Sequence, residues 1–281
     1  MSKFQSHSYF GARYYDSEVS VWLSVDPMAD DFPSWTPYHY CHANPLNMVD
    51  PNGMEATARA DDYYINSDGS IEVTLTDDDF DRFYLKSGGF SGEENHTTLI
   101  GQFDKNEHGL IQLEDFSFTN YDFGTSFSFN VKDGNESRSY IRGDALAALF
   151  GAMASTDFHD VTIIGVSNSD GSSPPPSVSH VDGKNMDFRY LRNDESGGRV
   201  LLGSSNLDIE RQNKFNDALY DFGWKDLLSE KFTPSGQTNS MLLNHTRHYS
   251  KSRHHNHLHT QGFSPYLIYY GGTLSGPTIT P

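Results

Sequence analysis

The stretch Ser179-His180-Val181-Asp182-Gly183-Lys184-Asn185-Met186-Asp187 is followed later in the chain by Arg253-His254-His255-Asn256-His257-Leu258-His259. A glycine between His180 and Asp187 can make a tight turn that lets both side chains face one point. His257 and His259 stand two residues apart, so on an extended segment they point to the same face. The two stretches therefore predict a strand-built site where side chains from separate parts of the chain meet.

The side chains of this site predict a metal centre. Imidazole and carboxylate groups are common zinc ligands, and catalytic zinc usually takes three protein ligands and a water. His180, Asp187 and His259 supply such a set, so we expect Zn²⁺ as the cofactor. Of His257 and His259, one could bind the ion while the other acts on the bound water. Two alternatives stay open: a solvated, histidine-rich edge strand, or a binding module whose structural zinc has four protein ligands.

The sequence on either side of this site predicts an α+β fold rich in β-structure. Beyond about residue 139 we expect helices over 144–153 and 209–222, the second closed by Gly223, and strands over 161–166 and 186–191. This C-terminal part would hold a small antiparallel sheet with flanking helices.

The middle part, residues 55–138, is acidic and alternates apolar and polar residues over 70–75 and 126–131, which predicts strands with one wet face. Turns at 67–69 and 132–134 would join such strands as hairpins or meanders. Residues 1–54 are rich in aromatic residues and Pro-containing turns, which indicates short extended pieces.

The first 54 residues contain three closely spaced motifs. They are Tyr9-Phe10-Gly11-Ala12-Arg13-Tyr14-Tyr15-Asp16, Trp22-Leu23-Ser24-Val25-Asp26-Pro27 and Asp50-Pro51-Asn52-Gly53-Met54. In this order they closely resemble the end of the Rhs repeat-associated core, which in that family forms a β-cocoon around a variable C-terminal toxin. The resemblance implies self-cleavage of the Met54–Glu55 bond by Asp26 and Asp50, since two carboxylates sharing one proton can serve as acid and base. Without the resemblance, each Asp-Pro would be interpreted as a turn opener.

A second resemblance covers about residues 140–270. The pattern His-x-x-Gly-x-x-x-Asp with a distal His-x-His resembles the LAS group of zinc peptidases, which includes D-Ala-D-Ala carboxypeptidases, murein endopeptidases and phage endolysin peptidases. It implies a LAS-like zinc peptidase domain at 139–281. His257 would be the general base, as in the murein endopeptidase branch, with His254 as a supporting group. Three features depart from the family: Val178 stands where many members have Ser, no substrate-gripping Arg occurs at 165–169, and no Glu base lies near the histidines.

Together the two resemblances imply a polymorphic toxin in three parts: an Rhs core segment (1–54), a β-rich spacer or docking module (55–138) and a peptidase (139–281). Such a toxin would leave its cell through a secretion system and cut peptidoglycan stem or cross-link peptides in the periplasm of a competitor. Its expected partners are peptidoglycan, the rest of the Rhs core, the secretion machinery and a cognate immunity protein.

The net charge and composition of the chain limit the possible classes of function. The formal net charge of −18 argues against a nucleic-acid-binding surface, because phosphate attraction is usually supplied by excess Lys and Arg. A metal-dependent HNH-like nuclease, suggested by His255-Asn256-His257, is therefore the second candidate. No apolar stretch is long enough to span a bilayer, and no signal-peptide pattern opens the chain. The single cysteine, Cys41, permits no internal disulfide.

Overall fold

A computed structural model describes residues 7–27, 29, 36–41, 48–50, 53, 57–58, 60–76, 80–87, 96–121, 124–249 and 254–270. The chain forms two compact units. The first consists of Met1–Ala60 with Asp77–Asp79, and the second of Asp61–Thr76 with Phe80–Pro281.

The first unit is built from very short strands. A three-stranded antiparallel sheet contains β1 (His7–Tyr9), β2 (Tyr14–Asp16) and β3 (Val21–Trp22), and a separate pair contains β4 (Met48–Val49) and β5 (Thr57–Ala58). The buried Trp22 is the centre of its packing, with the rings of Phe10, Tyr15 and Tyr40 at centroid distances of 5.2 to 5.5 Å. Short extended pieces joined by turns, as the sequence predicted, therefore form this unit.

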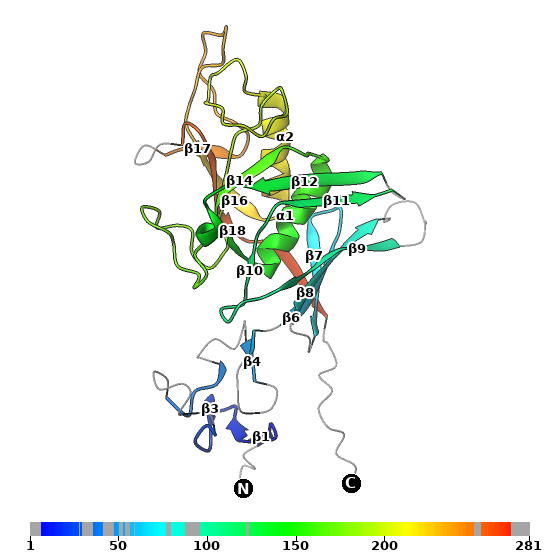
Figure 1. Ribbon diagram of the computed structural model, residues 1–281, viewed down its shortest axis with the longest axis vertical. Coiled ribbons are helices and arrows are strands. Elements are labelled where there is room, and N and C mark those ends of the chain that lie inside the picture. Colours follow the sequence, from blue (N-terminus) through cyan, green and yellow to red (C-terminus); the bar gives the residue numbers. More distant parts are fainter. Residues whose placement is uncertain are drawn as a thin grey trace. The chain divides into compact units, whose positions relative to one another are not determined.

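The second unit contains two larger sheets (Figure 1). The first sheet has seven strands in the order β11-β12-β14-β15-β18-β16-β17. Its members are β11 (Phe116–Asn120), β12 (Thr125–Val131), β14 (Val161–Gly165), β15 (Asp187–Phe188), β16 (Trp224–Ser229), β17 (Thr246–His248) and β18 (Leu258–Phe263). Its pairs are antiparallel except for β12 with β14 and β16 with β17.

The second sheet has five strands in the order β19-β7-β6-β8-β9. They are β6 (Ala60–Ile65), β7 (Ser70–Thr76), β8 (Phe80–Ser87), β9 (His96–Asp104) and β19 (Tyr266–Tyr270). A small antiparallel pair joins β10 (Leu110–Gln112) to β13 (Tyr140–Arg142).

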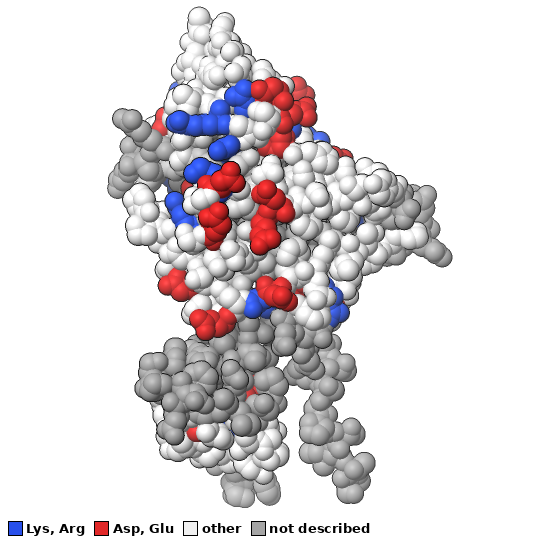
Figure 2. Space-filling view, in the orientation of Figure 1, with Lys and Arg blue, Asp and Glu red and all other residues white. Residues whose placement is uncertain are grey.

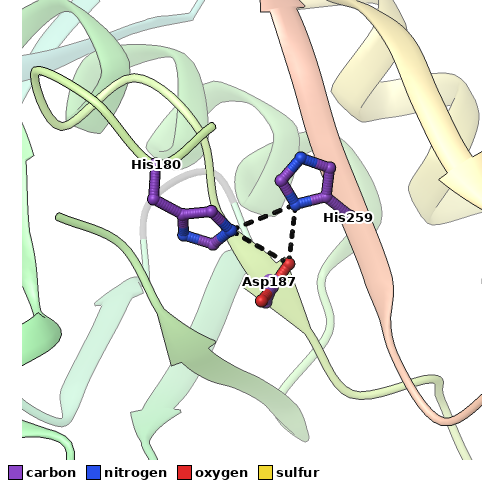
Figure 3. Close-up of side chains that lie close together, drawn as sticks. All are labelled: His180, Asp187 and His259. Carbon is purple, nitrogen blue, oxygen red and sulfur yellow. Dashed lines mark hydrogen bonds and ion pairs between the residues drawn. The ribbon is translucent and has the colours of Figure 1, made fainter. Parts of the chain in front are cut away.

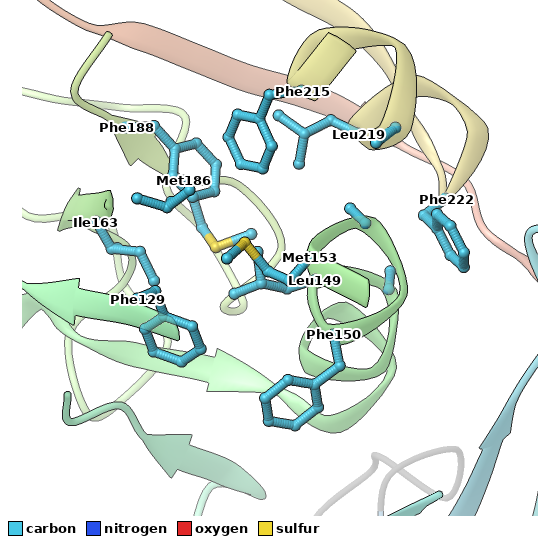
Figure 4. Close-up of a cluster of buried hydrophobic side chains, with 14 of the residues drawn as sticks. Phe129, Leu149, Phe150, Met153, Ile163, Met186, Phe188, Phe215, Leu219 and Phe222 are labelled. Atoms are coloured by element: carbon cyan, nitrogen blue, oxygen red, sulfur yellow. The ribbon is translucent and has the colours of Figure 1, made fainter. Parts of the chain in front are cut away.

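Helix α1 (Gly143–Thr156) connects the two sheets, because it contacts β12 of the first and β8 of the second. Helix α2 (Ile209–Asp221) packs against α1 and β16, and a short 3-10 helix, η2 (Glu136–Arg138), precedes β13. Almost every residue of α1 is buried, which explains its Ala- and Leu-rich sequence. Figure 4 shows the resulting core, in which the apolar side chains of both helices meet those of β12, β14 and β15.

Local signals in the sequence set the ends of α2. Asp208 accepts a hydrogen bond from the backbone N–H of Arg211 at 3.0 Å, as an N-cap does. At the other end, Gly223 has a φ of +128° and the chain turns into β16. Both helices that the sequence predicted are present, and the prediction of a β-rich α+β fold is confirmed.

Two expectations about chain organisation differ from the structure. The turn at 132–134 does not close a hairpin: β12 pairs in parallel with β14, and β13 and α1 lie between them in the chain. A boundary near residue 138 does not coincide with a division of the fold, because residues on both sides share one sheet and one hydrophobic core. The observed division, between Ala60 and Asp61, lies close to the predicted end of the Rhs-like segment.

Among the described residues, neither helix has the length and apolar character needed to cross a membrane.

Candidate metal centre

The candidate centre is built across two paired strands and one loop (Figure 3). Asp187 on β15 and His259 on β18 are direct antiparallel partners, so their side chains stand on the same face of the sheet. His180 comes from the loop before β15 and completes the group. The three residues that the sequence predicted as metal ligands therefore lie together.

A tight turn in this loop directs His180 toward the sheet. Asp182 and Gly183 both have left-handed backbone angles, with φ of 55° and 62°, and Lys184 N–H donates to the carbonyl of Val181 at 3.3 Å. The carbonyl of Gly183 in turn accepts from Arg142 N–H at 3.2 Å. The turn expected at Gly183 is confirmed, although the described residues immediately before it form a loop rather than a strand.

Replacing Gly183 with alanine is expected to destabilise the second unit by about 3 kcal/mol. A Cβ there would lie 2.6 Å from the backbone nitrogen of Arg142 and 2.8 Å from the backbone of Ile141, neither of which can swing away. Gly236 is the matched control, because its φ of +77° is similar but a Cβ would meet nothing within 4 Å. Gly236→Ala should cost only about 1 kcal/mol. Urea unfolding would contradict this if both variants lost the same stability.

The spacing of the three donor atoms suits zinc. Nε2 of His180 lies 3.1 Å from Nδ1 of His259 and 3.3 Å from Oδ1 of Asp187, and the last two atoms are 2.8 Å apart. Ligand atoms about 2.0 to 2.1 Å from a tetrahedral zinc are separated by roughly 3.3 Å. The three donors thus form one face of a tetrahedron of about the right size.

Each imidazole is held through its other ring nitrogen. Nδ1–H of His180 donates to the carbonyl of Val166 at 3.0 Å, which leaves the Nε2 lone pair directed into the site. Nε2 of His259 lies 3.1 Å from Oγ of Ser179, and donation to that oxygen leaves Nδ1 as the ligand atom. Such outer contacts fix the tautomer and orientation of metal-binding histidines. Both rings are almost fully buried.

The charge of Asp187 matches this arrangement. Burial by itself would raise the pKa of its carboxyl. Where ring N–H groups of His180 and His259 face Asp187, their hydrogen bonds outweigh burial and hold that pKa far below its usual range. A bound cation would replace these N–H groups and act on the pKa in the same direction. Asp187 is therefore an ionised carboxylate, the form that a cation requires.

His257 stands beside this group without belonging to it. Its Nε2 lies 3.9 Å from Oδ1 of Asp187, and its Nδ1 is 3.0 Å from Oδ1 of Asn256. Burial lowers the pKa of His257, which favours the neutral imidazole that can accept a proton. The ring of His254 packs 5.0 Å from that of His257 and 5.7 Å from that of His259. The four histidines and Asp187 therefore make one cluster.

A carboxylate that the sequence analysis overlooked lies at the edge of the cluster. Glu230, directly after β16, is 3.6 Å from Nδ1 of His255 and raises the pKa of His257, opposing the effect of burial. It is brought there by the antiparallel pairing of β16 with β18, in which Leu228 is opposite His259. Ser179 and the Val166 carbonyl were also missed as orienting groups. Only the position of Ser179, next to His180, offered a signal.

The predicted self-cleavage residues lie in the first unit. Asp26 and Asp50 are both buried and both paired with the guanidinium of Arg13, at 2.9 and 3.1 Å. The same guanidinium donates through Nε to the carbonyl of Gly53 at 2.5 Å, and Gly53 N–H donates to Asp50 at 2.7 Å. The two aspartates are thus held near each other by one arginine. Met54 and Glu55, the predicted cleavage point, lie outside the described residues.

Comparison of the chain with protein-family models, curated proteins and solved structures found no match.

Proposed function

We propose that the second unit is a zinc-dependent peptidase that cuts stem or cross-link peptides of peptidoglycan. The observation that carries the proposal is the convergence of His180, Asp187 and His259, with His257 next to them. Among the described residues, three side chains of this group could hold a metal ion. That number supports a catalytic zinc, because a closed structural site usually has four protein ligands.

The residues divide the chemistry between them. His180, Asp187 and His259 would hold the ion, which when bound makes water a better nucleophile and polarises a carbonyl oxygen. His257, neutral and half-buried, would take a proton from the attacking water and return it to the leaving amine. His254 packs behind it and limits the positions that its ring can adopt.

The biological setting is a further part of the proposal and rests on the sequence resemblance. The three motifs of residues 9–54 support assignment of this segment to the end of an Rhs core. The chain would then be a secreted antibacterial toxin that meets peptidoglycan in the periplasm of a competitor. A cognate immunity protein and the secretion machinery would then be its partners.

A metal-dependent nuclease remains the second candidate because a water-activating histidine beside a metal also suits phosphodiester cleavage. The net negative charge of the chain favours the peptidase over the nuclease. The chain has an excess of acidic residues, and Figure 2 shows basic side chains next to acidic ones on the visible face of the protein. Nucleic-acid-binding surfaces generally carry an excess of positive charge instead.

Metal removal provides the test. Purified peptidoglycan and plasmid DNA would each be incubated with the protein as purified, after chelation, and after chelation with zinc added back. Released muropeptide fragments should be at least tenfold fewer after chelation and recover with zinc. Intact peptidoglycan in all three samples would overturn the peptidase, and plasmid cleavage in the zinc sample would support the nuclease.

A further inference from the structure

The strand β19 lies at one end of the five-stranded sheet, next to β7. Its sequence, Tyr-Leu-Ile-Tyr-Tyr, contains no charged residue and no proline. Its three tyrosines are between 50% and 68% exposed. An end strand of this composition is well suited to pair with a further strand, because backbone N–H and C=O groups form a regular row along the outer edge of a sheet.

The side chains of β19 are apolar or aromatic on both faces of the sheet. Leu267 is the strand partner of the buried Ile71 and packs against the core. Ile268 is the partner of Glu72, so it lies on the opposite, outer face, together with the tyrosines at 266 and 270. A strand that remains exposed to water usually has charged or polar side chains on its solvent side. The strand β19 has them on neither side.

The other end strands of the two larger sheets differ from β19. The strand β17 has three residues, one of which is Arg247. The strand β9 ends in Asp104, and its pairing with β8 is irregular at one point. The strand β11 exposes Ser117 and Thr119. Charge, short length, irregular pairing and polar side chains all discourage strand addition, so β19 is the end strand of these sheets best suited to it.

The charge near β19 permits a second copy of this chain to approach. A formal net charge of −18 makes two copies repel each other in general. On the outer face, however, Glu72 of β7 pairs with Lys86 at 2.6 Å. Further across the same sheet, Asp62 pairs with Arg82 at 3.3 Å. Because these acidic groups are matched by basic ones, a second acidic chain would meet little repulsion on this side of the protein.

We propose that two copies of the protein associate through β19, which pairs antiparallel with β19 of the second copy about a two-fold axis at Ile268. Such an interface uses the same surface on both copies, as in most protein dimers. The axis puts Ile268 opposite Ile268, Tyr266 opposite Tyr270 and Leu267 opposite Tyr269. Every cross-strand pair is then apolar or aromatic, and pairs of this kind stabilise antiparallel strands. The two five-stranded sheets would thus join edge to edge.

The mass of the protein in solution tests the proposal, and it should rise toward that of two chains between about 2 and 200 µM. Ile268→Lys should raise the dissociation constant of the dimer at least about tenfold, because two like charges would face each other across the axis. Ile268→Glu should have the same effect. An equimolar mixture of the two variants should form the dimer again, because unlike charges then lie opposite each other.

Leu99→Lys is the matched control. Leu99 is half exposed on β9, at the other end of the same sheet, so its variant should dimerise as wild type does. Light scattering after gel filtration measures the mass, and thermal unfolding of each variant shows whether it is folded.

Single cysteines report the register of the two strands. Ile268→Cys should form a disulfide-linked dimer under mild oxidation, because directly opposite Cα atoms in antiparallel strands are about 4.5 to 5.5 Å apart. Tyr266→Cys should not link to itself but should link to Tyr270→Cys when the two are mixed. Wild type, whose Cys41 is buried, is the control and should form no link.

Three results would overturn the proposal. The first is a wild type that stays monomeric at every concentration. The second is a dimer that Ile268→Lys leaves intact, since the two copies would then meet elsewhere. The third is a mixture of folded Ile268→Lys and Ile268→Glu that stays monomeric. None of these measurements depends on metal binding or peptide cleavage, so their outcome is separate from that of the proposed function.

Discussion

Replacing His259 with alanine is expected to abolish zinc binding and, for the proposed peptidase, to lower kcat/KM for peptidoglycan peptides about a thousandfold or more, which corresponds to about 4 kcal/mol of transition-state stabilisation. His259 provides one of three donor atoms and is the direct strand partner of a second, Asp187. With two ligands left, the site cannot hold zinc at micromolar concentrations. Metal content after gel filtration and the rate of peptide cleavage are the two measurements.

His257→Ala is the matched variant, because His257 directly precedes β18 and lies 3.9 Å from Asp187 but outside the group of three candidate ligands. It should keep zinc at wild-type occupancy and lose about 10²- to 10⁴-fold in kcat, the usual contribution of a general base. Two results would contradict this assignment: loss of zinc from His257→Ala, or full activity in His259→Ala.

The second large effect concerns stability and arises away from the metal centre. Asp81 on β8 and Lys105 are almost completely buried, and their charged groups are 2.7 Å apart. Asp81 also accepts a hydrogen bond from Asp61 N–H at 2.9 Å. Lys105→Met should lower the free energy of unfolding by about 3 to 5 kcal/mol at neutral pH, because it leaves a buried carboxylate without its counter-charge.

The pH dependence of this loss is a separate signature. Burial raises the pKa of Asp81 even though Lys105 opposes it, so the folded state binds this proton more tightly than the unfolded state does. The stability contributed by Asp81 is therefore present at low pH and falls as pH rises from its ordinary pKa to the raised one. Without Lys105 that pKa is higher still, and the variant should regain stability on acidification.

Urea unfolding of wild type and Lys105→Met at pH 7.5 and 5.5 would measure the effect. The difference between the two proteins should be smaller at pH 5.5. The double variant Asp81→Asn with Lys105→Met is the control: it removes both charges and should be closer to wild type at pH 7.5 and have little pH dependence. An equal loss at both pH values would show that Lys105 contributes packing rather than charge.

What the sequence could predict depended on how local the signal was. The C-terminal end of α2 followed from Gly223, and the turn between His180 and Asp187 from the conformational freedom of Gly183. The grouping of His180, Asp187 and His259 was also predictable, because their residue types and spacing suggested one site that could hold a metal ion. Glu230 was not predictable, because its place beside the site depends on which strands pair and in which register.

The predicted domain boundary near residue 138 shows a second limit of prediction from sequence. Acidic composition in residues 55–138 describes the wet face of the strands, whereas the opposite face of the same strands supplies apolar side chains to the core around α1. The acidic residues of this segment therefore indicate the exposed face of its strands and not a separate module. Alternation with period two predicted the strands correctly but contained no information on their partners.

The pairing of β19 with β7 has a consequence for how this protein reaches its folded state. Tyr266 is the strand partner of Ser70, a contact between residues about 200 positions apart that closes a large loop late in chain order. No fragment that starts at residue 139 can form this contact or the parallel pair of β12 with β14. A chain that has been unfolded, for example to cross a narrow channel, must form these distant contacts again. Because contacts between residues far apart in sequence form slowly, we expect the second unit to refold slowly and cooperatively.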